Sequence, residues 1–142
     1  MRAMGVDVGA ARIGVAISEG SLALAHNTLA ATPTAPVELA GLAKDRQVET
    51  IFVGLPLSLS GARTKSSELA IEFATLLAAE TDVRVKLVDE RLTTVSSQRL
   101  LRQAGKNTRQ AKSMIDGESA RLILDFALGA PHATTALEDL DA

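Results

Sequence analysis

The order of apolar runs at the start of the chain limits the folds that this sequence can adopt. Residues 4–8 and 13–17 are rich in β-forming residues and flank a four-residue stretch that contains Gly9, a spacing typical of a hairpin. Residues 22–32 predict a third strand, which Pro33 ends. Three successive antiparallel strands are therefore expected before any helical pattern begins.

Helical and strand patterns alternate after these three strands. We expect helices at residues 37–46, 66–80, 94–104 and 113–128. We expect strands at residues 50–53 and 83–88, and polar loops at residues 57–64 and 106–112. Strands first, and then alternating helices and strands, predict a mixed α/β sheet with helices on its faces.

Composition narrows the class of protein. The 142 residues fit one domain, residues 1–142, with an acidic tail from about residue 130 that we expect to be flexible. The absence of cysteine excludes disulfides and thiolate metal sites and fits a reducing cytoplasm. No apolar run reaches the roughly 18–20 residues of a membrane helix, and no signal peptide opens the chain. We expect a cytoplasmic protein without a membrane partner.

Acidic residues stand where core residues would be expected. Asp7 lies between two valines of the first strand, and a buried ionised side chain costs several kcal/mol unless a partner compensates it. Asp89 and Glu90 close the strand at residues 83–88 and should point to opposite faces. We choose Glu90 as the site residue and keep Asp89 as the alternative, because the inward face is not visible from sequence.

A third acid comes from the last helix. Asp116 shares a helical face with Ala120, Ile123 and Ala127, the apolar stripe expected to pack on the sheet. Three clustered carboxylates would suit a hard cation such as Mg²⁺ or Mn²⁺, which can activate water for phosphodiester cleavage. The alternatives are an ion pair of Asp7 with Arg12 or Arg91, and a helix-dipole role for Asp116.

Basic residues gather between two of these acids. Residues 91–112 contain no acid, although the chain carries a net charge of −2. The basic residues of this stretch are Arg91, Arg99, Arg102, Lys106, Arg109 and Lys112. Together with Arg12 they are candidates for binding a nucleic-acid backbone. A solvated helix face and loop is the competing interpretation.

Four ordered motifs resemble the YqgF/RuvX family of Holliday junction resolvases, also described as pre-16S ribosomal RNA nucleases. They are residues 6–9 with 12–16, residues 53–57, residues 89–94, and Lys112 with Asp116 and Ala120. The resemblance covers about residues 4–128. It implies an RNase H-like fold with a mixed five-stranded sheet flanked by helices, whose first three strands are antiparallel. It also implies catalytic, metal-binding acids at Asp7, within residues 89–90 and at Asp116.

We therefore expect an endonuclease that uses Mg²⁺ or Mn²⁺ and cleaves structured nucleic acid. The catalytic, metal-binding residues would be Asp7, Glu90 and Asp116. The substrate would be a four-way DNA junction or a ribosomal RNA precursor, which the motifs cannot separate, and a junction would suit a homodimer. The rival interpretations are an actin-like or sugar-kinase-like nucleotide-phosphate-binding domain, and a non-catalytic nucleic-acid-binding module.

Overall fold

A computed structural model describes the backbone of residues 2–93 and 109–141, and their side chains apart from those of residues 109–116. The helix predicted at residues 94–104 lies outside the described residues. Within the described part of the chain, no helix has both the length and the apolar character needed to cross a bilayer.

The strands form one mixed sheet with the order β3-β2-β1-β5-β6-β7, and β4 pairs with β2 beside β3. Their bounds are β1 (Arg2–Val8), β2 (Arg12–Glu19), β3 (Leu22–Ala25), β4 (Leu29–Ala30), β5 (Val48–Leu55), β6 (Arg84–Asp89) and β7 (Thr135–Ala136). The first three strands are antiparallel, and β1, β5 and β6 are parallel to one another. The mixed α/β sheet predicted from the sequence is confirmed.

The sheet has seven strands where five were expected. The predicted strand at residues 22–32 is divided into β3 and β4, which pair with opposite ends of β2. Between them residues 26–28 leave the regular ladder, although the His26 amide still donates to the Val15 carbonyl at 2.7 Å. The other additional strand is β7, which pairs antiparallel with β6 at the sheet edge. The extra strands therefore lie at the periphery.

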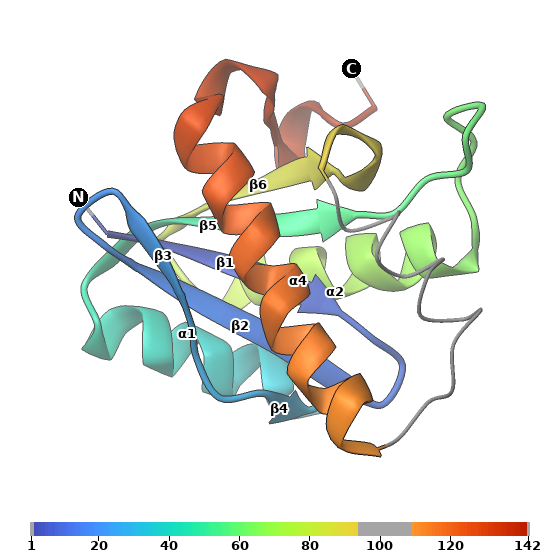
Figure 1. Cartoon of the computed structure of the whole chain (residues 1–142). Coiled ribbons are helices and arrows are strands. Elements are labelled where there is room, and N and C mark those ends of the chain that lie inside the picture. Colours follow the sequence, from blue (N-terminus) through green and yellow to red (C-terminus); the bar gives the residue numbers. More distant parts are fainter. Residues whose placement is uncertain (1, 94–108, 142) are drawn as a thin grey trace.

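Helices cover both faces of the sheet, as Figure 1 shows: α1 and α2 lie on one face and α4 crosses the other. Their bounds are α1 (Ala35–Asp45), α2 (Lys65–Glu80) and α4 (Arg109–Gly129). The last helix begins four residues before the predicted start, so the loop predicted at residues 106–112 is wrong from Arg109 onward. Arg, Gln, Ala and Lys fill these positions, and all four are good helix formers despite their polarity.

The C-terminal segment, which the sequence predicts to be a flexible acidic tail, contains short regular elements. It forms two short 3₁₀ turns, η2 (Pro131–Ala133) and η3 (Leu137–Asp139), on either side of β7. Leu137 and Leu140 pack against the core of the α1/α2 face, and Asp141 forms a 2.5 Å ion pair with Arg63. The segment thus contacts the rest of the fold through two leucines, one ion pair and the pairing of β7 with β6.

The two faces of the sheet are packed differently. The α1/α2 face carries large aliphatic side chains such as Leu39, Ile51 and Leu77. The α4 face is rich in alanine, and a Cβ added at Gly5 would lie 2.6 Å from the Ala120 carbonyl oxygen. Because the strand offers no side chain there, α4 lies almost in backbone contact with β1, the strand that carries Asp7.

Gly5→Ala is expected to lower the free energy of unfolding by about 1–3 kcal/mol, since the added methyl group meets helix backbone rather than a flexible side chain. Gly41→Ala is the matched control. Gly41 lies exposed in α1, with no described atom within 4 Å of the added Cβ, and should raise stability by about 0.5–1 kcal/mol. Urea unfolding measures both, and equal stability of the two variants would contradict the close contact.

Candidate active site

Asp7 is held inside the fold near the carboxyl end of β1. Its side chain is 3% exposed. Residues two apart on a strand share a face, and Gly5 faces α4, so Asp7 points to the α4 side as well. Its neighbours Val6 and Val8 belong to the core on the α1/α2 side. The first predicted site residue is therefore a buried carboxylate beneath the last helix.

Glu90 is the second buried acid and begins η1 (Glu90–Leu92), immediately after β6. Its side chain is 1% exposed. A Cβ added at Gly54 in β5 would lie 3.3 Å from both Cγ and Oε2 of Glu90, and 2.5 Å from Cδ1 of Ile123 in α4. The Glu90 carboxylate thus occupies the space above Gly54 that a side chain would otherwise fill.

The sheet brings these two acids together. Strand β5 lies between β1 and β6, and the β1–β5 register pairs Gly5 with Phe52 and then Val6 with Val53. One step further in this register, Asp7 lies beside Gly54, across a strand spacing of about 4.8 Å. Both carboxylates therefore gather around Gly54 on the α4 face, although they are more than eighty residues apart in the chain.

Asp89, the alternative to Glu90, has a different partner. Its carboxylate accepts hydrogen bonds from the backbone amide of Arg91 at 2.9 Å and from Nη2 of Arg91 at 2.7 Å. This side-chain hydrogen bond raises the pKa of Arg91. This pairing argues against one alternative from the sequence, an ion pair of Asp7 with Arg91, because the Arg91 guanidinium is bound to Asp89. The structure favours Glu90 over Asp89 as the buried member of the pair.

The side chains of several predicted site residues lie outside the described part of the structure. Asp116 lies in α4, one helical turn before Ala120, but its side chain is outside the described residues. The same holds for Arg109 and Lys112, and residues 94–108, with Arg99, Arg102 and Lys106, are not described at all. Arg12 is half-buried at the start of β2, where its carbonyl accepts from the Gly9 amide at 2.9 Å.

The donor set suits a hard divalent cation. Carboxylate oxygens are the ligands that such ions prefer, and a cation would relieve the repulsion between two neighbouring carboxylates. Among the described side chains no three acidic or histidine groups gather as a metal site, so Asp7 and Glu90 are two donors of a set whose third member stays a prediction.

Gly54 is the residue that sequence reasoning missed. The sequence predicts a strand at residues 50–53 that stops before Gly54, but β5 continues to Leu55 and contains this glycine. A glycine inside an otherwise apolar strand marks a close approach by another group, and that signal was available from the sequence. Here the approaching groups are the Glu90 carboxylate and Ile123 of α4.

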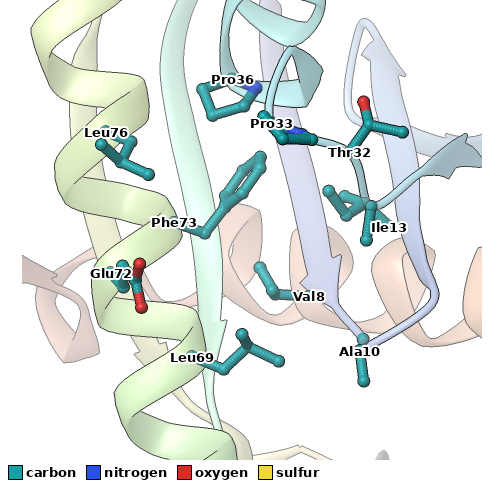
Figure 2. A pocket seen from close by; sticks show the side chains of 12 residues that line it. Val8, Ala10, Ile13, Thr32, Pro33, Pro36, Leu69, Glu72, Phe73 and Leu76 are labelled. Carbon is teal, nitrogen blue, oxygen red and sulfur yellow. The ribbon is translucent and has the colours of Figure 1, made fainter.

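A separate cavity of about 260 Å³ lies on the opposite face of the sheet. Figure 2 shows Val8, the residue after Asp7, between Leu69 and Phe73 of α2, with Pro33 and Pro36 beyond Phe73. Since Val8 and Asp7 point to opposite faces of β1, this apolar cavity does not open toward the two acids.

Comparison with known proteins agrees with this arrangement. The sequence profile of the RuvX family, described as Holliday junction resolvase, matches residues 1–130. A protein of Leifsonia xyli subsp. xyli named "Putative pre-16S rRNA nuclease" is 43% identical over 136 residues, covering 93% of this chain and 88% of its own. One of the same name from Anaeromyxobacter sp. is 37% identical over 137 residues, covering 94% of this chain and all of its own.

Solved structures of Thermus thermophilus RuvC share the fold. RuvC in complex with a Holliday junction substrate superposes with a TM-score of 0.58 at 15% identity, covering 96% of this chain and 98% of that chain. A second RuvC structure from this organism gives a TM-score of 0.54 at 12% identity, with coverage of 96% and 99%. The RNase H-like fold expected from the sequence is confirmed.

Proposed function

Because the chain belongs to the RuvX family of Holliday junction resolvases, we propose that it is an endonuclease that depends on Mg²⁺ or Mn²⁺ and cleaves phosphodiester bonds in structured nucleic acid. One observation carries the proposal: the buried carboxylates of Asp7 and Glu90 gather around Gly54 on one face of the sheet. Carboxylate oxygens are the ligands that hard divalent cations prefer, and such an ion would favour the charged form of both acids.

The residues have separable tasks. Asp7 and Glu90 would hold the ion together with Asp116 of α4. A bound divalent ion supplies an activated water and stabilises the leaving oxygen. Helix α4 excludes bulk water from both acids, and Gly54 leaves the Glu90 carboxylate room beside Asp7. Arg12, next to the β1–β2 turn, is a candidate for contacting a backbone phosphate, as are Arg99, Arg102, Lys106, Arg109 and Lys112.

The substrate is a four-way DNA junction or a ribosomal RNA precursor. The family description names the junction, and the two relatives are named for pre-16S rRNA. The same acidic site serves both substrates, because both reactions break a phosphodiester bond. Symmetric cleavage of a junction would need two active sites and therefore a homodimer. Family membership across residues 1–130 disfavours the actin-like, sugar-kinase-like and non-catalytic interpretations.

Side-by-side cleavage tests the proposal. A synthetic four-way DNA junction, a precursor RNA with its unprocessed 16S end, and a linear duplex of each are incubated with Mg²⁺, Mn²⁺ or EDTA. We expect cleavage of one structured substrate with either ion, little cleavage of the duplexes, and none with EDTA. Asp7→Asn protein purified in the same way excludes a contaminating nuclease. Failure to cut either structured substrate with either ion would refute the proposed function.

A further inference from the structure

The connection between β5 and α2 contains a compact loop, which we call the finger (residues 57–63). Its two ends form an isolated antiparallel bridge. Inside it, the Ser58 amide donates to the Ala62 carbonyl at 3.0 Å and the Gly61 amide donates to the Ser58 carbonyl at 2.8 Å. Gly61 has a φ of 88°, in the left-handed region that glycine adopts without strain. The finger therefore has one defined backbone shape.

The base of the finger is fixed by the start of α2. Thr64 is the N-cap of this helix and forms a capping box with Ser67. The Ser67 amide donates to Oγ1 of Thr64 at 3.3 Å, and the Thr64 amide donates to Oγ of Ser67 at 2.8 Å. The Ser67 hydroxyl also donates to the Pro56 carbonyl, on the other side of the finger. Both ends of the finger are thus attached to one buried serine.

The tip of the finger is tied to the segment that carries Glu90. Arg91 donates from Nη1 to the Leu59 carbonyl at 3.2 Å, while its Nε and Nη2 donate to the Asp89 carboxylate. Its guanidinium lies against Gly61, whose added Cβ would be 3.1 Å from Nη1. The sequence suggested that Arg91 binds nucleic acid, but three of its nitrogens are directed at the protein, where they link the finger to η1.

Leu59 stands out at the tip. Its side chain is 92% exposed, more than that of any other described large apolar residue. Single exposed leucines are common and do not by themselves indicate a binding site. This one differs because Arg91, the residue after Glu90, donates to its carbonyl, and because Figure 1 shows the finger extending past the end of β5. A fixed loop thus presents an apolar side chain to solvent, and Arg91 ties this loop to η1, the turn that begins with Glu90.

We propose that Leu59 is a substrate contact that packs against unstacked bases where the nucleic acid is branched or distorted, and that Arg91 is its positioning residue. This inference rests on the proposed function. Apolar side chains, leucine among them, act as wedges between base steps that are already partly unstacked. A regular duplex offers no such faces without a cost in stacking energy, so the contact would favour structured substrates over linear ones.

The test compares Leu59→Ser with Leu22→Ser. Leu22 is also exposed, at 60%, but it begins the edge strand β3, opposite Glu19, and β3 lies three strands away from β5 in the sheet. Binding is measured with Ca²⁺ in place of the catalytic ion. The distorted substrates are a four-way DNA junction and a hairpin RNA with an internal bulge, each with 2-aminopurine at the distorted position. A linear DNA duplex and a linear RNA duplex serve as undistorted controls. Leu59→Ser should bind the preferred distorted substrate about tenfold more weakly and lose the rise in 2-aminopurine fluorescence. Leu22→Ser should match the parent, and Leu59→Met should restore binding.

Arg91→Lys tests the positioning role, since lysine keeps the positive charge but lacks the planar guanidinium that donates to Asp89 and Leu59 at the same time. It should speed hydrogen exchange at the amides of Gly61 and Ala62. Like Leu59→Ser, it should also weaken binding to the preferred distorted substrate. Equal binding and fluorescence for Leu59→Ser and Leu22→Ser would overturn this inference alone, provided that the parent cleaves. A parent that neither binds nor cleaves the junction or the RNA would overturn the proposed function and this inference with it.

Discussion

Asp7→Asn should lower the rate of cleavage at least about a thousandfold while the protein stays folded. Asparagine matches aspartate in size and shape, so the packing beneath α4 is kept, but the negative charge that attracts a divalent ion is lost. Metal activation of water and stabilisation of the leaving oxygen contribute several kcal/mol, and each 1.4 kcal/mol is a factor of ten in rate. Single-turnover cleavage with Mg²⁺ or Mn²⁺ measures the loss.

The matched control is Asp125→Asn, which removes the same charge from an exposed position of the same helix that covers Asp7. Its cleavage rate should stay within about twofold of the parent, because exposed charges contribute little. Calorimetric titration with Mn²⁺ should show binding to the parent and to Asp125→Asn and a loss of affinity in Asp7→Asn. An Asp7→Asn protein that cleaves at the parental rate would mean that the acid is structural.

Gly54→Ala should have the second largest effect, with cleavage reduced about a hundredfold and unfolding made easier by about 1–3 kcal/mol. The added methyl group would lie 2.5 Å from Cδ1 of Ile123 and 3.3 Å from Oε2 of Glu90. The first contact strains the packing of α4 on the sheet. The second pushes the Glu90 carboxylate away from its place beside Asp7, and a shift of an ångström at a catalytic group is enough for a loss of this size.

A double variant separates the two contacts. Ile123→Val removes Cδ1 and costs about 0.5–1.5 kcal/mol by itself. In the double variant Gly54→Ala/Ile123→Val the strain against α4 is relieved. Its loss in free energy of unfolding should therefore be smaller than the sum of the losses in the two single variants. Its cleavage should stay low, because the new methyl group still meets Glu90. Full activity of Gly54→Ala at a temperature where it is folded would contradict the placement of the Glu90 carboxylate over Gly54.

Local patterns in the sequence were enough to predict the centre of the fold. The hairpin of β1 and β2, the parallel strands β5 and β6, and the helices α1 and α2 all follow from apolar periodicity and glycine or proline boundaries. Strand β7 could not be predicted, because two residues are too few to show a strand pattern and their pairing with β6 is a contact between segments far apart in the sequence. The early start of α4 was missed because its first residues are polar, and polarity was given more weight than helix propensity.

The site was predictable in part. Asp7 was found because a carboxylate inside an apolar strand is costly, and that cost is readable from sequence. The choice between Asp89 and Glu90 needed the structure, since strand parity alone does not say which face is covered. Arg91 links the finger to η1, which no spacing could have shown, and its contact with nucleic acid stays a prediction. Asp116 and the basic residues from Arg99 to Lys112 stay predictions.

The crossing of α4 over Gly5 and Gly54 has a consequence for the order in which a newly made chain becomes capable of its chemistry. A growing polypeptide that has not yet released α4 already contains Asp7 and Glu90, but their face of the sheet still lacks this cover. Helix α4 is synthesised after each of the three parallel strands that position the two acids. The centre that we propose is therefore assembled only after this helix has folded back over the sheet.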